Sequence, residues 1–425
     1  MNRVLLTVFV LAGISIPVVA QDKAIDEVRV RQLVRQLEAR GRDNRDNAEA
    51  ELRELGPKVL SLLPQIDART GGELKQRLLR IRDHLEKQQL AESANESRLT
   101  LRGTMTLTEA FSKIEEQTGN TVVDYRGRRG QSNDNTEVTL DLEDVPFWEA
   151  LDRILDDAGL TVFTFVGEPR KLAVVAAEGS AAKRLGSAAY SGLFRVEPTT
   201  LSLERNLRNP GADIFRMNVE MLWEPRVLPI QIRQDLEDIE LTTDNGETLS
   251  VASTGTIQLP VQPGVASVDI RLPLSLPSRD AKEIKSLKGR FTALVPGGDV
   301  TFEFTNLAAR NVSQRKAGIT VVLDQVFRND GVQQINVILR LDQAGEALQS
   351  HLDWVENNVV RLVDPNGNVA DEPGYEKYRE RDSEVGYSYI FPIEEDLDGW
   401  KLIYTTPAGI AEVPVEYEVE NIALP

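Results

Sequence analysis

The chain has 425 residues, carries a formal net charge of −18 at pH 7 and contains no cysteine. This length predicts three or four domains, and the ordinary apolar and charged fractions exclude wholesale disorder. The acidic balance disfavours non-specific nucleic-acid binding, because that affinity comes mostly from Lys and Arg. The missing cysteine excludes disulfides, thiolate metal sites, cysteine nucleophiles and a lipid-modified cysteine.

Residues 1–20 predict a secretory signal. Arg3 precedes an apolar run from Val4 to Ile16, and small residues lead to a cleavage point after Ala20. The alternative is an uncleaved membrane anchor, although the run is short for a spanning helix. An export signal in a chain without cysteine predicts a periplasmic or secreted protein of a bacterial envelope.

Residues 21–90 predict a helical domain, and they are less acidic than the rest, with 15 Lys/Arg against 13 Asp/Glu. Apolar residues at helical spacing predict four helices, with glycines between them. The helices are expected at 24–39, around 48–55, from Pro57 to Ile66 and around 74–85. The run AEAELRELGPKVLSLLPQI at 48–66 resembles a HEAT repeat, which implies paired antiparallel helices. The alternative is a four-helix cap on the next domain.

Residues 98–178, after a polar linker, predict a small α/β module with the element order βαββαββ. Short alternating apolar runs predict its strands, and apolar stripes at helical spacing predict its two helices. The expected helix limits are Thr106 or Thr108 with Gly119 for the first helix, and Asp144, Pro146 in the first turn and Gly159 for the second.

Two stretches of this module, TLTEAFSKIEEQTGNTVV and VTLDLEDVPFWEALDRILDDAGLTV, resemble the short N-terminal module of secretins and TonB-dependent receptors. The resemblance implies a periplasmic docking domain without catalysis. It covers about a fifth of the chain. No transmembrane barrel sequence follows the module, and its loop at 127–135 is longer than the pattern requires.

The segments 190–308 and 309–425 predict two tandem antiparallel β-sandwiches, because short alternating strands recur between Pro and Gly. Phe291–Val295 and Val300–Phe304 are expected as separate strands, with Pro296 and Gly298 between them. FEFTNLA at 302–308 matches YEVENIA at 417–423 in residue type, and three further landmarks recur in the same order. These matches predict an internal duplication of about 115 residues.

Candidate chemistry in the sequence is sparse. His84 and His351 have no partner at ligand spacing, and no nucleophile, phosphate or dinucleotide motif is present. The run DPNGNVAD bunches oxygen side chains around a glycine, as calcium loops do, but lacks the EF-hand spacing and is typical of a tight turn. Its weak calcium candidates are Asp364, Asn366, Asn368 and Asp371.

Five aromatic residues of the β-rich half form an alternative sugar-stacking set, although such residues are more often core in sandwiches. They are Trp223, Trp354, Trp400, Tyr387 and Tyr389. Arg126, Arg128 and Arg129 lie in a glycine-rich loop of an otherwise acidic chain, so they are the candidates for docking an acidic partner. A solvated loop is the structural alternative.

These observations predict an exported multi-domain α+β protein that is not an enzyme and needs no cofactor. Its expected role is a scaffold or adaptor that binds another envelope protein through residues 98–178. The alternatives are a carbohydrate- or calcium-binding sandwich protein and, with less support, an unrecognised hydrolase.

Overall fold

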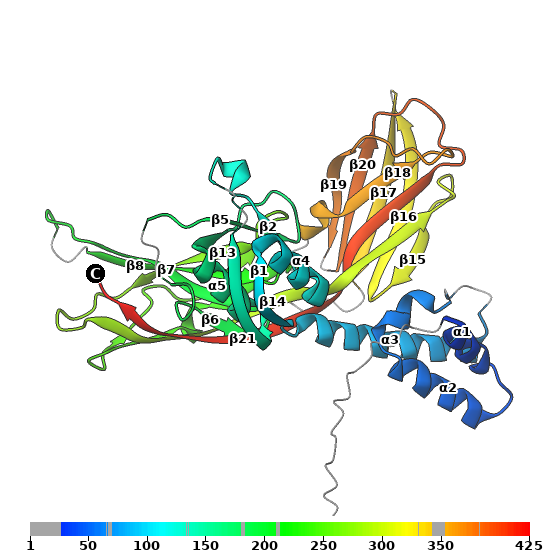
Figure 1. Ribbon diagram of the computed structural model, residues 1–425. Helices are drawn as coiled ribbons and strands as arrows, with labels where there is room; N and C mark the ends of the chain where they lie inside the picture. Colours follow the sequence, from blue (N-terminus) through cyan, green and yellow to red (C-terminus); the bar gives the residue numbers. More distant parts are fainter. Residues whose placement is uncertain are drawn as a thin grey trace, which may run out of the picture. The chain divides into compact units, whose positions relative to one another are not determined.

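The computed structural model describes residues 27–425 apart from 65, 67–69, 133, 135, 180–182, 210–212, 330, 342–352 and 382. The predicted signal at 1–20 and His351 therefore lie outside the described residues. The chain divides into two compact units, Met1–Leu85 and Glu86–Pro425. The described part is mostly β with separate helices, in agreement with the predicted α+β class (Figure 1). No helix in the described part has the length and apolar character needed to span a membrane.

The first unit is helical, and its core is a cluster of apolar side chains that includes Val30, Leu33 and Leu52. Its elements are α1 (Glu27–Gln36), α2 (Arg42–Glu54), η1 (Pro57–Leu62) and the start of α3 (Gly72–Ala94). The long third helix expected from Pro57 is wrong, because only the short 3-10 helix η1 forms. Pro64 explains this, since a residue before proline avoids the helical region and Leu63 is extended at ψ 138°.

The second unit begins with an α/β segment in which strands and helices alternate. Its elements are β1 (Arg98–Thr106), α4 (Leu107–Thr118), β2 (Thr121–Asp124), η2 (Gly127–Arg129), β3 (Glu137–Pro146), α5 (Phe147–Ala158), β4 (Leu160–Phe163) and β5 (Lys171–Ala176). β1 pairs with β3 in a two-stranded antiparallel sheet, and β5 lies between β2 and β4 in a three-stranded sheet. Both helices contribute buried side chains to one core with these sheets.

Local signals fix the ends of the two helices. Thr106 accepts a hydrogen bond from the backbone of Glu109, whose carboxylate accepts one from the backbone of Thr106, so the first helix starts with a capping box. Gly119 and Gly159 end the helices in the left-handed conformation that glycine adopts without steric cost. The predicted cap at Asp144 is wrong. Pro146 occupies the cap position of α5 instead and makes no side-chain cap bond.

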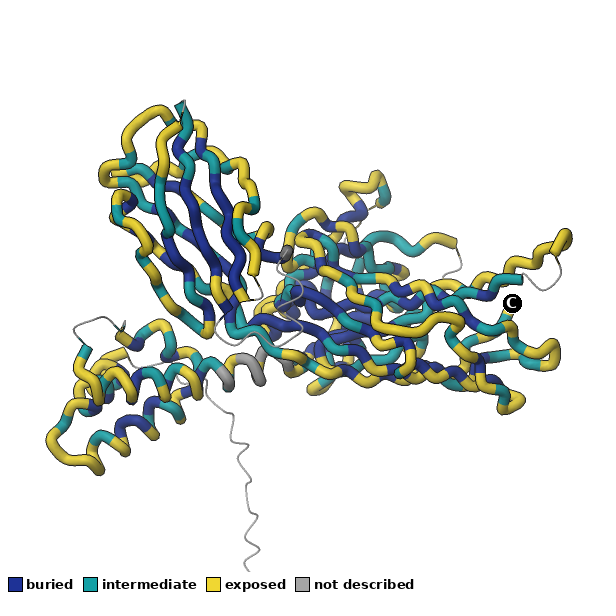
Figure 2. The backbone as a smooth tube through the Cα atoms, turned by 180° about the vertical axis from the view of Figure 1, so that it is seen from behind, coloured by how far each residue is buried: buried dark blue, intermediate teal, exposed yellow. Residues whose placement is uncertain are grey.

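The rest of the second unit forms two β-lobes, each with two sheets facing across an apolar core (Figures 1 and 2). In the first lobe, a four-stranded sheet has the order β13-β8-β7-β6. Its strands are β6 (Ala189–Ser191), β7 (Phe194–Glu204), β8 (Ile214–Trp223) and β13 (Ser267–Leu274). In the second lobe, a five-stranded sheet has the order β15-β16-β17-β20-β19. Its strands are β15 (Val312–Lys316), β16 (Ile319–Asn329), β17 (Val332–Leu341), β19 (Gly374–Arg381) and β20 (Glu384–Phe391).

A seven-stranded sheet contributes side chains to both cores and so belongs to both lobes. Its main path is β11-β10-β14-β21-β18, with β9 beside β14 and β12 beside β9. Its strands are β9 (Gln231–Asp235), β10 (Glu240–Thr243), β11 (Thr248–Leu249), β12 (Thr256–Pro260), β14 (Glu283–Phe304), β18 (Val359–Val363) and β21 (Lys401–Ala423). The short 3-10 helices η3 (Leu236–Asp238) and η4 (Asp353–Asn357) lie between strands of the two lobes.

β14 and β21 form one antiparallel ribbon that connects the two lobes (Figure 1). The first half of β14 supplies Phe291 to the first core, and its second half supplies Phe302 to the second. β21 runs the other way, so Tyr404 lies in the second core and Tyr417 in the first. Residues after 309 therefore complete the first lobe, which the expected division between 190–308 and 309–425 did not include.

The two separate strands expected around Pro296 and Gly298 are wrong, because both residues lie inside the continuous strand β14. Pro296 pairs with Ile410, and Gly298 pairs with Ala408. Proline and glycine usually interrupt strands. Here the long partner β21 holds the ribbon together on either side of them.

Candidate docking surface

The α/β segment is attached to the first lobe through α5. Trp148, which is 1% exposed, donates its indole N–H to the carbonyl of Leu193 at 2.8 Å. The fully buried carboxylate of Asp152 accepts hydrogen bonds from Arg184 Nε at 2.9 Å and Arg195 Nε at 2.7 Å. It also accepts the hydroxyl of Tyr190 at 2.7 Å. One carboxylate of the segment thus binds Arg184 before the first lobe, Tyr190 on β6 and Arg195 on β7.

A second buried carboxylate, Glu224, belongs to the first lobe and binds groups of the segment. Glu224 accepts the backbone N–H of Ser97 at 2.7 Å and the amide of Asn120 at 3.0 Å. Arg226, two residues further on, pairs with Glu224 at 2.7 Å and donates its backbone N–H to Asn120 at 3.0 Å. Buried charges are stable only when paired and hydrogen-bonded, so these bonds fix the segment on the first lobe.

The three-stranded sheet β2-β5-β4 has two faces of different character. Val122, Leu172 and Val174 point to the main core of the segment. The alternate residues Val123, Phe163 and Val175 point the other way, around the smaller buried group formed by Tyr125, Val166 and Ala173. Successive side chains of a strand point to opposite faces. The outer face is therefore also apolar, and only partly covered.

Arg126 is part of the structure of this face rather than a free cation. It is buried, and its guanidinium binds both carboxylate oxygens of Asp124 at 2.7–3.1 Å. Arg126 opposes the effect of burial and lowers the pKa of Asp124. Gln131 also accepts the backbone N–H of Ala176 at 2.9 Å, so the loop after β2 is tied to β5. Of the three arginines singled out by sequence, this one is not available to a partner.

Arg128 and Arg129 are exposed and lie on aromatic rings. The guanidinium carbon of Arg128 is 4.4 Å from the ring centre of Tyr125, whose hydroxyl also accepts a hydrogen bond from it at 2.9 Å. The guanidinium carbon of Arg129 is 4.9 Å from the ring centre of Phe163. Such cation–π contacts orient a long side chain that would otherwise move freely.

Phe165 completes this surface and is 67% exposed. Its ring centre is 6.3 Å from that of Phe163 in an edge-on arrangement. Its backbone is fixed, because Phe165 pairs with Val265 of the first lobe and Val166 donates to the carbonyl of Gly264 at 3.0 Å. We call Tyr125, Arg128, Arg129, Phe163 and Phe165 the aromatic–arginine patch.

The approach of the first lobe to this strand is close. A Cβ atom at Gly264 would lie 2.8 Å from the carbonyl carbon of Gly167, and φ of Gly264 is +83°. Both facts require glycine there. The lobe therefore supports the segment after β4 that presents Phe165.

The charged neighbours of the patch are mostly paired with each other. Glu168 lies 3.8 Å from Arg128 and binds Lys171. The hydrogen bond from Lys171 lowers the pKa of Glu168. Arg170 pairs with Asp299 at 2.8 Å. Among the described residues, Arg129 has no carboxylate partner.

The calcium candidates form a tight turn after β18. Asp364 accepts the backbone N–H groups of Asn366 and Asn368 at 2.8 Å each, and also the side-chain amide of Asn368 at 2.8 Å. The amide of Asn368 lowers the pKa of this carboxyl group. Asp371 makes no such bond. Within the described part of the chain, no group of three or more His, Asp or Glu side chains is arranged to hold a metal ion.

The aromatic side chains considered for sugar stacking belong to the two cores of the lobes. Trp223 lies in the first core, whereas Trp354, Tyr387 and Tyr389 lie in the second, and Trp400 packs against the second. They cannot form an exposed stacking face. His84 is exposed on α3.

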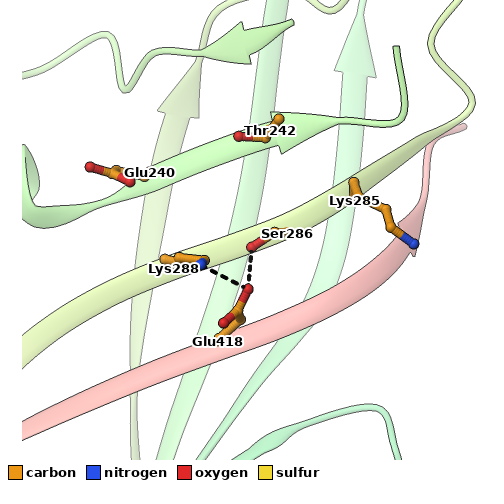
Figure 3. A pocket seen from close by; sticks show the side chains of 6 residues that line it. All are labelled: Glu240, Thr242, Lys285, Ser286, Lys288 and Glu418. Atoms are coloured by element: carbon orange, nitrogen blue, oxygen red, sulfur yellow. Dashed lines mark hydrogen bonds and ion pairs between the residues drawn. The ribbon is translucent and has the colours of Figure 1, made fainter. Parts of the chain in front are cut away.

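An open polar hollow lies on the seven-stranded sheet (Figure 3). Its lining consists of Glu240, Thr242, Lys285, Ser286, Lys288 and Glu418. Glu418 accepts the hydroxyl of Ser286 at 2.8 Å and pairs with Lys288 at 3.2 Å. The charges of this hollow compensate one another, because it contains two lysines and two glutamates.

Sequence reasoning found the arginines of the patch but missed its three aromatic members. The available signal was the period of two along this strand, because Leu160 and Val162 point to the main core and Phe163 therefore points away from it. No family model matches this chain, and no curated protein matches it either.

Proposed function

We propose that this chain is an exported, non-enzymatic scaffold or adaptor that binds another protein of the bacterial envelope. Residues 98–178 would be its docking module, of the type found at the start of secretins and TonB-dependent receptors, and residues 21–90 a HEAT-like helical segment. The aromatic–arginine patch is the observation that carries this proposal. It combines the residue types that dominate binding energy at protein interfaces with a fixed backbone.

The fixed geometry supports the proposal on energetic grounds. Binding loses free energy when mobile side chains must be ordered, by about 0.5–1.5 kcal/mol for each rotamer-rich side chain. Arg128 and Arg129 already lie on Tyr125 and Phe163, and the first lobe supports Phe165. Much of that ordering is therefore complete before a partner arrives.

The two β-lobes would be tandem β-sandwiches that arose by duplication and serve as spacers. The order β13-β8-β7-β6 in the first lobe parallels β20-β17-β16-β15 in the second. The matching motifs that begin at 302 and 417 are 115 residues apart. The same spacing carries Val295 onto Ile410 and Pro296 onto Ala411, and these four residues pair with each other at the centre of the ribbon. This is the arrangement expected of two copies related by a local two-fold axis.

No observation favours the carbohydrate or calcium alternative. The candidate aromatic residues lie in or against the cores, and Asp364 is used by its own turn. The proposal therefore concerns contact between proteins.

Photo-crosslinking in the native envelope tests the proposed function. A photoreactive phenylalanine analogue replaces Phe165, and the matched control carries it at Phe327, which is 38% exposed on the second lobe. We expect a protein adduct from position 165 that is absent from position 327. Equal adducts at both positions, or none at 165, would contradict a docking role for the patch.

A further inference from the structure

We infer that the aromatic–arginine patch binds an acidic, extended polypeptide segment that carries a large apolar side chain. A carboxylate of this segment would lie on Arg129, next to Arg128 with its partner Glu168, and its apolar side chain would lie on Phe165. This inference rests on the proposed function, and it adds the chemistry of the partner.

The expected negative charge of the partner follows from which arginine and lysine side chains near the patch already have a carboxylate partner. Arg126 is paired with Asp124, Arg170 with Asp299, and both Lys171 and Arg128 with Glu168. Arg129 has no carboxylate within reach among the described residues, although the chain as a whole carries a net charge of −18. An exposed guanidinium without a partner on an acidic protein is a site for a carboxylate from another molecule.

The stacking of Arg129 also favours carboxylates by geometry. A guanidinium lying on the face of the Phe163 ring keeps the N–H groups at its edge free for a bidentate bond. Arginine binds carboxylates in this planar, two-bond manner, which a lysine cannot reproduce. The patch therefore presents an oriented receptor for Asp or Glu.

The apolar part of the partner follows from Phe165. Phe165 is 67% exposed, which is the highest exposure of any large apolar residue among the described residues of 98–178. Phe163 lies at its edge, 6.3 Å away between ring centres. A leucine or aromatic side chain would bury both rings and exclude water from the neighbouring ion pairs.

A polypeptide fits this surface better than an anionic membrane or a nucleic acid. Membrane recognition by charge uses clusters of four to eight basic residues, whereas this patch offers two. Glu168 lies 3.8 Å from Arg128 and would face the lipid headgroups or phosphates, and Asp299, which pairs with Arg170 of the same loop, adds a second negative charge. A peptide can place its carboxylates selectively and avoid these neighbours.

Selection from a displayed random-peptide library on the purified chain tests the inference. The wild-type chain should enrich sequences with two or more Asp or Glu near a Phe, Trp or Leu. The variant Arg128→Glu with Arg129→Glu should lose this preference and favour Lys and Arg. A wild-type selection that enriches nothing, or only neutral or basic sequences, would overturn the inference.

Affinity measurements on an enriched peptide separate the two parts of the patch. Fluorescence anisotropy should show a loss of about 30-fold for Phe165→Ala and about 10-fold for Arg129→Glu, as for central interface anchors. The matched controls Phe327→Ala and Arg361→Glu, at exposed positions of the second lobe, should bind as wild type. Affinity should also fall as salt rises. Unchanged affinity in both patch variants would contradict the inference.

Two further outcomes distinguish this inference from the proposed function. A protein adduct at position 165 in the envelope that survives Arg128→Glu with Arg129→Glu keeps the proposed function but removes the acidic partner. Patch-dependent binding to phosphatidylglycerol vesicles, with no acidic peptide enriched, would assign the patch to a membrane surface instead. Melting temperatures of all variants verify that they are folded.

Discussion

Asp152 and Glu224 show how single residues hold the α/β segment against the first lobe. Both carboxylates are fully buried, and each is surrounded by donors from across the contact. Removing one partner of a buried ion pair costs about 3–5 kcal/mol, because the other charge stays buried without compensation. At this contact, these polar bonds act together with apolar packing, because Leu222 and Ala266 of the first lobe belong to the core of the segment.

We expect Asp152→Asn to lower the free energy of unfolding of the second unit by about 3–5 kcal/mol, because it removes the charge that binds both Arg184 and Arg195 and leaves the buried Arg195 paired with Glu197 alone. Urea denaturation followed by tryptophan fluorescence measures this change. The control Asp157→Asn, at an exposed position of the same helix, should stay within about 0.5 kcal/mol of wild type. Equal stability of the two variants would show that the Asp152 network does not hold the contact.

Glu220 gives the first lobe a defined response to pH. Burial raises the pKa of this carboxyl group, a hydrogen bond with Ser267 opposes the effect, and Asp269 and Glu197 on the neighbouring strands reinforce it. Because the folded pKa lies above the unfolded one, the protonated form favours folding. This contribution is complete below the unfolded value of 4.5 and is lost as pH rises through the folded pKa.

Glu220→Gln should therefore stabilise the chain at pH 7 by about 0.2–1 kcal/mol for each like-charge cross-strand pair that it removes. The gain should shrink as pH falls towards 4. Chemical denaturation at several pH values provides the measurement, with Glu178→Gln as an exposed control. A gain that is the same at pH 4 and pH 7 would refute the charge explanation.

The capping box of α4 is the clearest case in which the start of a helix could be predicted from the sequence. Two threonines were candidates for the cap, and Thr106 is the one that accepts the N–H of Glu109. We expect Thr106→Ala to cost about 0.5–2 kcal/mol of unfolding free energy, and Thr108→Ala to cost less. Thermal unfolding of both variants decides between them. A larger loss for Thr108→Ala would be inconsistent with the capping box.

Helix ends were predictable where a side chain or glycine acts on its own backbone, as at Thr106, Gly119 and Gly159. The predicted ends of elements were wrong where another residue or strand determines the end. Pro64 shortened the third helix of the first unit, and a long partner strand carried β14 through Pro296. Strand partners are not local information, because alternation defines two faces but not what covers them. For the same reason the sequence indicated Arg128 and Arg129 but not the rings beneath them.

At the scale of the whole molecule, the ribbon of β14 and β21 should make the two lobes unfold together. Each core contains residues from both strands, for example Phe302 in the second and Tyr417 in the first. We expect Phe302→Ala to cost about 3–5 kcal/mol and to lower the hydrogen-exchange protection of β8 in the first lobe as well. Hydrogen exchange measured by mass spectrometry tests this. Loss of protection confined to the second lobe would mean that the lobes are independent.

The ribbon also determines when the first lobe can be finished. Strands β6 to β13 and the first half of β14 leave the ribosome early, yet residues 413–423 of β21, which pair with that half of β14, come after the other strands of the second lobe. Until then, the edge of β14 that β21 will occupy has no partner, and unpaired edges are where strands associate with the wrong chain. The time during which this edge stays unpaired therefore depends on how long residues 305–423 take to be made or delivered. A chain carried through a membrane unfolded and released all at once would shorten that interval to the time of folding itself.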